Sequence, residues 1–231
     1  RSVYKWNFAL ELKENRLTCL DAYDNVLSLG DKKGYVFPYE EQAIAGMGQA
    51  SKFDPLVADG NKRGSSEVTQ IMYLPRCSMI ALLSNNAITI VQSYDLSSVQ
   101  EIKSKKVHLF CVNSAVYYNE GSSMITDKQA TRVSQQLMMD QFCVVTTDKQ
   151  LAFFELSHST SIKFEEDKSA SGKQLSHLPT QMYWDMDLLF LATKKAYQIL
   201  DKHSGNILQQ VLLYNQPVPQ MFLSKSKCLI L

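Results

Sequence analysis

The stretch SMIALLSNNAITI (residues 78–90) consists of an apolar run, a short polar turn and a second apolar run. The same pattern occurs three more times, in NVLSLGDKKGYVF (25–37), QFCVVTTDKQLAF (141–153) and DLLFLATKKAYQI (187–199). Each run is too short for a helix and is rich in β-branched, aromatic and aliphatic side chains. We interpret the four stretches as β-hairpins with mostly buried strands.

The four stretches align in columns. The last strong apolar position before the turn is Leu29, Leu82, Val145 and Leu191. A small polar residue follows two places later, at Asp31, Ser84, Thr147 and Thr193. We expect Gly34 to supply a positive φ in the first turn, which the other three turns do without.

Further apolar segments flank the hairpins. One precedes each hairpin: RLTCLDAY (16–23), VTQIMYL (68–74), VHLFCV (107–112) and PTQMYW (179–184). A fourth segment follows three of them: VQEIKS (99–104), SIKFEE (161–166) and NILQQVLL (206–213). Four antiparallel strands per unit, repeated head to tail, predict an all-β fold, a β-propeller.

The spacing of the repeat sets the expected blade boundaries. Successive copies are separated by 53, 63 and 46 residues, against about 40–50 for simple blades. We therefore expect blades at 16–48, 67–104, 107–166 and 178–214, the start of a fifth at 218–231, and two excursions at 49–66 and 113–140. On this interpretation the chain is about four and a half blades of a larger ring, most simply of seven.

The composition of the chain limits the classes of function that it is expected to have. The chain of 231 residues carries 24 Lys and Arg against 23 Asp and Glu, so its net charge of +1 gives no electrostatic reason to expect nucleic-acid binding. No apolar stretch is long enough to span a bilayer, and we expect no signal peptide. Five cysteines, an odd number without a CxxC pair, favour buried free thiols and a cytoplasmic protein.

In this order, the motifs resemble the citron homology (CNH) domain. The similar segments are LTCLDAYDNVLSLGDKKGYVFPYE (17–40), MIALLSNNAITIVQSYDLSSVQ (79–100), FCVVTTDKQLAFFEL (142–156) and YQILDKHSGNI (197–207). The resemblance is to the vacuolar-sorting type, found in HOPS and CORVET subunits such as the TGF-β-receptor-associated protein. Each motif is chiefly apolar, and the resemblance rests on the order of all four.

The resemblance implies a non-catalytic interaction domain. In the leading hypothesis it belongs to a subunit of an endosomal or lysosomal tethering complex, which binds the other subunits and a Rab-family GTPase and reaches membranes through these partners. The alternative is a regulatory CNH module of a signalling kinase or Rho-type exchange factor.

No residue is predicted to be catalytic or to bind a cofactor or metal. His108, His158, His177 and His203 are far apart in the sequence and have no second ligand at metal-binding spacing. The aspartates of the 21/24 and 185/187 pairs are expected to cap turns at strand ends. One basic cluster, Lys103, Lys105 and Lys106, is either a solvated loop or a contact for anionic lipid.

Overall fold

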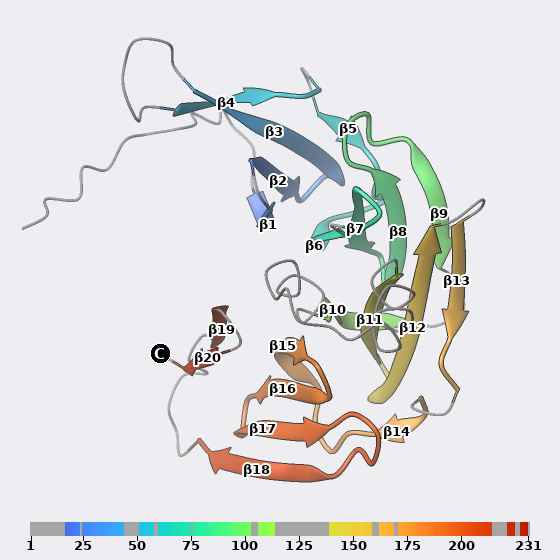
Figure 1. Ribbon diagram of the computed structural model, residues 1–231, viewed down its shortest axis with the longest axis vertical. Coiled ribbons are helices and arrows are strands. Elements are labelled where there is room, and N and C mark those ends of the chain that lie inside the picture. The colour runs from blue at the N-terminus through green and yellow to red at the C-terminus, as the bar shows by residue number, and fades with distance from the viewer. Residues whose placement is uncertain are drawn as a thin grey trace, which may run out of the picture. The chain divides into compact units, whose positions relative to one another are not determined.

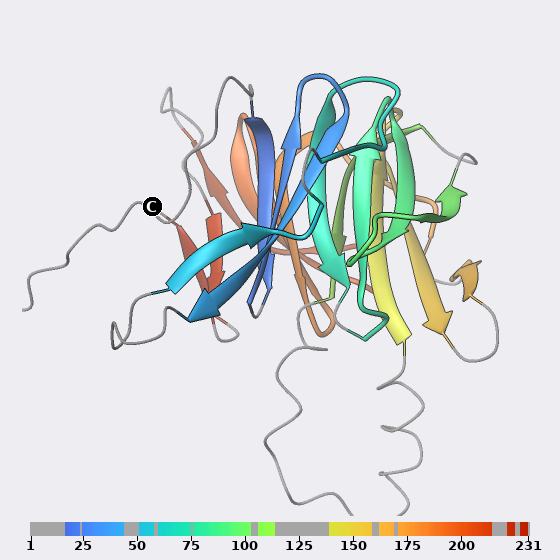
Figure 2. The same ribbon diagram turned by 90° about the horizontal axis from the view of Figure 1, so that it is seen from above.

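The computed structural model describes residues 17–23, 25–43, 51–57, 60–74, 76–102, 106–113, 139–158, 162–168, 171–213, 221–224 and 227–230. The described residues form antiparallel β-sheets (Figures 1 and 2). Two compact units are present. The first contains the described residues up to Tyr73 and Met79–Ile102, and the second contains Leu74–Ser78 and the described residues from Lys106 onward. No helix in the described ranges is long and apolar enough to cross a membrane.

The first unit holds two sheets whose strands pair in chain order. Its strands are β1 (Leu17–Tyr23), β2 (Val26–Asp31), β3 (Tyr35–Ala43), β4 (Ser51–Pro55), β5 (Asn61–Lys62), β6 (Val68–Leu74), β7 (Met79–Ser84), β8 (Ala87–Gln92) and β9 (Ser98–Ile102). The first sheet runs β1-β2-β3-β4, with β5 also paired to β3, and the second runs β6-β7-β8-β9. This order of neighbours is that of a propeller blade.

The second unit repeats the arrangement. Its strands are β10 (Val107–Val112), β11 (Met139–Thr146), β12 (Gln150–His158), β13 (Ile162–Glu166), β14 (Lys173–Gln174), β15 (Pro179–Asp185), β16 (Leu188–Thr193), β17 (Ala196–Asp201), β18 (Ile207–Leu212), β19 (Met221–Ser224) and β20 (Lys227–Ile230). The third sheet runs β10-β11-β12-β13, with β14 on β12, and the fourth runs β15-β16-β17-β18. The last two strands pair with each other.

The hairpin repeat is confirmed. Leu29, Leu82 and Leu191 are buried in the second strands of their sheets, β2, β7 and β16. Every residue of β7 is buried, as expected for a strand covered on both faces. In the first unit, Leu82 packs in a core cluster with Val36.

The register corrects the third copy by one residue. Asp31 lies opposite the first residue of β1, and Thr193 lies opposite the first residue of β15. In the third sheet the residue opposite the first residue of β10 is Thr146. The small polar column therefore contains Thr146 in place of Thr147, and the apolar column contains Val144 in place of Val145.

The small polar residues close their hairpins by accepting backbone hydrogen bonds. The Asp31 carboxylate accepts the N–H groups of Lys33 and Tyr35, each at 2.8 Å. The Thr146 hydroxyl accepts the N–H of Gln150 at 3.0 Å. In the fourth sheet, Thr193 accepts the N–H of Ala196 at 3.0 Å. Ser84 instead donates to the Ser66 carbonyl at 3.0 Å.

Two expectations about turns and connections are wrong. Segment 49–66 was expected to be an excursion, but it supplies β4 and β5, so the first sheet extends well beyond residue 48. Gly34 has a positive φ of 90°, as expected, but it is not alone. The second and third turns also use positive φ, at Asn85, Asn86 and Lys149. Most of the 113–140 excursion lies outside the described residues.

The expectation of buried free thiols is confirmed for Cys111 and Cys143, whereas Cys19 is free but only half-buried. Cys77, Cys111 and Cys143 are free and buried. Cys111 lies opposite Cys143 across β10 and β11. Burial raises the pKa of the Cys111 thiol well above its ordinary value, and the neighbouring Cys143 raises it further.

Replacing Leu82 or Leu191 by Ala should lower the free energy of unfolding by about 2–5 kcal/mol, because each side chain is buried and its removal leaves a cavity. Urea denaturation measures the change. The matched control is Leu20→Ala, in which the leucine is 66% exposed, and it should change stability by only about 0.5 kcal/mol. Equal effects at all three positions would contradict the burial described above.

Candidate protein-interaction site

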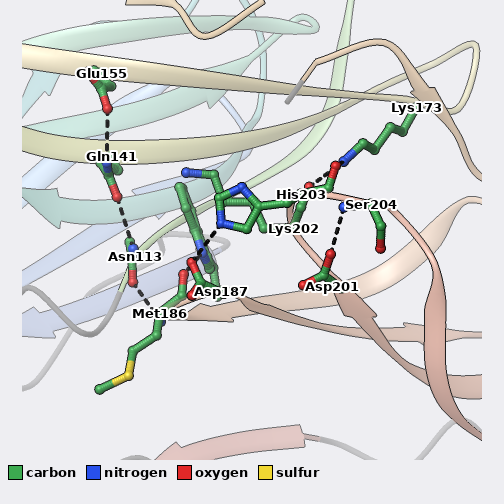
Figure 3. Close-up of polar contacts among 11 residues, drawn as sticks. Asn113, Gln141, Glu155, Lys173, Met186, Asp187, Asp201, Lys202, His203 and Ser204 are labelled. Atoms are coloured by element: carbon green, nitrogen blue, oxygen red, sulfur yellow. Dashed lines mark hydrogen bonds and ion pairs between the residues drawn. The ribbon is translucent and has the colours of Figure 1, made fainter. Parts of the chain in front are cut away.

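Asn113 connects the third and fourth sheets through its side chain. It follows β10 and is buried, and its backbone forms an isolated parallel β-bridge with Trp184 of β15. Its Oδ1 accepts the N–H of Met186 at 3.2 Å, and its Nδ2 donates to Gln141 Oε1 at 3.0 Å. Gln141 Nε2 in turn donates to Glu155 Oε1 at 2.9 Å. Figure 3 shows this chain of hydrogen bonds running from the β15–β16 turn across β11 to β12.

Trp184 holds the same turn from the core side. The side chain is buried, and its indole ring meets Phe153 of β12 edge-on, with centroids 5.4 Å apart. The indole N–H donates to the carbonyl oxygen of Met186 at 2.6 Å. A buried Trp needs such a partner for its N–H. Both backbone polar groups of Met186 are therefore bound by side chains.

Met186 is exposed and strained. It occupies a two-residue turn between Asp185 and Leu188, with a φ of 51° and 61% of its surface exposed. The left-handed region costs an L-residue roughly 1–2 kcal/mol. Strained residues held by their surroundings concentrate at functional sites. The thioether is thus presented to solvent on a fixed backbone.

Lys202 supports this turn from the β17–β18 turn. Its ammonium lies 4.9 Å from the centre of the Trp184 ring and 5.5 Å from that of Phe153. A cation over aromatic faces is attracted by their quadrupoles. The Lys202 N–H also donates to the Asp187 carbonyl at 2.8 Å. These contacts tie the β17–β18 turn to the turn that carries Met186.

The β17–β18 turn is itself fixed by polar contacts, drawn in Figure 3. The Lys173 ammonium donates to the carbonyl oxygens of Lys202 and His203. Burial lowers the pKa of Lys173, although neighbouring aspartates oppose this shift. The Asp201 carboxylate accepts the Ser204 N–H at 2.6 Å, and this hydrogen bond lowers the pKa of Asp201.

Three exposed side chains gather on these two turns: Met186, Asp187 and His203. We refer to them as the turn patch. His203 Nε2 lies 3.1 Å from Asp187 Oδ1, but both side chains are 68% exposed, so the pair adds little stability. An exposed Met beside a polar pair on a rigid backbone suits recognition of a protein surface, since Met adapts its shape to a partner.

The sequence predictions for polar sites have mixed outcomes. Lys106 is exposed before β10, whereas Lys103 and Lys105 lie outside the described residues. Asp187 pairs with His203. Asp21 does not cap a turn: its carboxylate accepts the N–H of Tyr73 at 2.6 Å.

Asp24 lies outside the described residues, and the buried Oδ1 of Asp185 has no hydrogen-bond partner among them. His108, His177 and His203 are exposed, and nothing is described of the His158 side chain. In the part of the chain that the structure describes, no group of three His, Cys, Asp or Glu could hold a metal ion. The sequence analysis missed Asn113, Gln141 and Met186, whose residue types form no recognisable motif.

One comparison with known proteins bears on the fold. No protein-family model matches the chain, and no curated protein matches it. Among solved structures, the chain is similar to the β-propeller domain of Myceliophteria thermophila Cps50 (Swd1), with a TM-score of 0.57 and 12% identity over 93% of this chain. The chain spans 62% of that domain's length. This likeness shows the fold alone: the chain is an all-β protein of the β-propeller class.

Two computationally designed proteins show weaker likeness. Ika4 has a TM-score of 0.48 and 10% identity, over 89% of this chain and 96% of its own. Ika8 has a TM-score of 0.49 and 9% identity, over 92% of this chain and 66% of its own.

A buried carboxyl group lies elsewhere in the second unit. Asp140, at the start of β11, is fully buried, and no described group forms a well-aligned hydrogen bond with either carboxylate oxygen. Burial raises the pKa of Asp140 to about 6, while the nearby Cys77 thiol and Arg76 charge offset part of that shift. The native state therefore retains a proton that the unfolded chain releases near pH 4.

Replacing Asp140 by Asn should change how stability depends on pH. Because the pKa is raised in the folded state, the wild-type free energy of unfolding falls as pH rises from about 4 to 6. Asp140→Asn removes this contribution, so the variant should match the wild type at pH 4 and exceed it by roughly 2–3 kcal/mol at pH 7. Urea denaturation at several pH values measures the difference.

The control for this experiment is Asp54→Asn. Asp54 forms a surface ion pair with Lys52 at 2.8 Å, and its loss should change stability by less than about 1 kcal/mol at every pH. If the free energy of unfolding depended on pH in the same way for the wild type and Asp140→Asn, the raised pKa of Asp140 would be contradicted.

Replacing Met186 by Gly should preserve or raise stability. Glycine relieves roughly 1–2 kcal/mol of left-handed strain and costs about 0.5–1 kcal/mol in chain entropy, for a net gain of up to about 1.5 kcal/mol. Thermal and urea unfolding measure the change. Asn86→Gly is the control, because asparagine tolerates its φ of 61° and gains less. A clear loss of stability in Met186→Gly would show that the exposed thioether has a structural role.

Proposed function

We propose that this chain is a non-catalytic interaction domain of CNH type, in a subunit of an endosomal or lysosomal membrane-tethering complex. The observation that carries the proposal is the order of the CNH-like motifs. Each segment that resembles the family lies on its own sheet: the first on β1–β3, the second on β7–β9, the third on β11–β12 and the fourth on β17–β18. The β-propeller fold is the one that a CNH domain requires.

The turn patch supports a role in recognition. Propellers present their loops on a rigid scaffold, and binding residues concentrate on such loops. Met186 provides an apolar anchor, and Asp187 and His203 provide a polar rim beside it. Interfaces commonly combine an adaptable apolar centre with polar surroundings.

The proposed partner of this patch is a Rab-family GTPase. The γ-phosphate of GTP orders the switch segments of small GTPases, and hydrolysis releases them. A rigid patch would therefore distinguish the two nucleotide states, because only the ordered state presents a preformed surface. On this proposal the domain acts in the cytoplasm and reaches the membrane through its GTPase and the other tethering subunits.

Binding to purified GTPases tests the proposal. The chain should bind at least one Rab-family GTPase loaded with a non-hydrolysable GTP analogue, and bind its GDP form more weakly, in biolayer interferometry. Met186→Asp should weaken this binding by about tenfold or more, because it places a charge at the apolar centre. The matched control is Tyr94→Asp, on a different turn and 64% exposed, which should leave affinity unchanged.

The outcomes separate the hypotheses. Binding that both variants leave intact would place the docking surface elsewhere on the domain. Binding to Rho-family in place of Rab-family GTPases would favour a regulatory CNH module of a kinase or exchange factor. Binding to neither family in either nucleotide state contradicts the GTPase proposal.

A further inference from the structure

Strand β18 is an unusually apolar sheet edge. It is the outer strand of the fourth sheet, and β17 is its only partner among the described strands (Figure 1). Every residue of β18 is exposed. Four of its six side chains are large and apolar: Ile207, Leu208, Val211 and Leu212.

The other outer strands carry charges, and β18 carries none. The outer strands of the first three sheets are β4 (SKFDP), β9 (SVQEI) and β13 (IKFEE). Each contains at least one charged side chain, whereas β18 reads ILQQVL. Proteins commonly protect exposed edges with charged residues, because an unprotected edge is a template for another strand. The fourth sheet lacks this protection.

The backbone direction shows which residues of β18 face outward. Just beyond the strand, the Leu213 N–H donates to the Lys195 carbonyl at 2.8 Å, so this residue faces β17. Backbone groups alternate along a strand. The N–H and C=O groups of Gln210 and Leu212 therefore point to the free edge. An irregularity in the β17–β18 register lies before Gln209, so the regular edge starts there.

We propose that β18 pairs with β18 of a second copy of this chain, antiparallel, with the two-fold axis at Gln210. A two-fold axis that relates two antiparallel strands runs perpendicular to the sheet that they form. Residues that lie opposite each other across the axis therefore have their side chains on the same face of that sheet. An axis at Gln210 meets this condition. The outward N–H and C=O groups of Gln210 in one copy then face the C=O and N–H groups of Gln210 in the other. Leu212 of each copy then lies beside Leu208 of the other, at the irregularity where the regular edge ends.

Self-complementarity selects a second copy as the occupant. The exposed side chains of Leu212 and Leu208 approach each other at both ends of the paired segment, and apolar contacts between strands stabilise antiparallel sheets. At the axis, a Gln side chain can donate to and accept from its symmetry mate. No like charges are brought together, because β18 is uncharged. A two-fold interface requires such a self-complementary surface.

Charge substitutions at Gln210 test the pairing. The wild-type chain should be a dimer in sedimentation velocity and light scattering. Gln210→Lys and Gln210→Glu should each weaken the dimer by about fivefold or more, because like charges would face each other across the axis. Mixing the two variants in equal amounts should restore dimerisation, because Lys then faces Glu.

A charge-matched control separates this effect from a general change in net charge. Glu165→Gln, at an exposed position of β13, raises the net charge by one, as Gln210→Lys does, and should leave the dimer unchanged. Circular dichroism and thermal unfolding should show all variants folded, since both positions are exposed. A monomeric wild-type chain, a dimer that persists in Gln210→Lys, or a mixture that fails to dimerise would each overturn the proposal.

Discussion

The structure depends on one constraint: the second strand of each sheet is buried where it enters its turn. The polar residue that ends each of these strands is buried too, and a buried polar side chain needs a hydrogen-bond partner within the protein. Asp31, Thr146 and Thr193 satisfy this requirement by accepting N–H groups from their own turns. The repeat is therefore as much a repeat of hydrogen-bond acceptors as of apolar side chains.

The same requirement produces the candidate site. The β15–β16 turn has no acceptor of its own for the Met186 N–H, and Asn113 of the third sheet supplies one from 73 residues away. Trp184 satisfies the carbonyl of the same residue. The turn is therefore held by the neighbouring sheet, and Met186 can keep a strained conformation without help from its own side chain.

The sequence predicts the class of fold and the buried positions because both depend on local apolar pattern. It misplaces the third copy by one residue because Val144 and Val145 are both buried, and a strand covered on both faces shows no alternation to fix its register. It misses β4 because Lys52, Asp54 and Pro55 read as a connection. Asn113 and Met186 could not be predicted, because their roles arise from a contact between sheets.

The pair of buried thiols in the third sheet has a practical consequence. Cys111 and Cys143 lie opposite each other across β10 and β11, out of contact with solvent. A thiol reacts as its thiolate, so burial and the raised pKa of Cys111 both suppress its alkylation in the closed sheet. The rate at which these two thiols are alkylated therefore measures how often β10 and β11 separate. It reports local unfolding without any introduced probe.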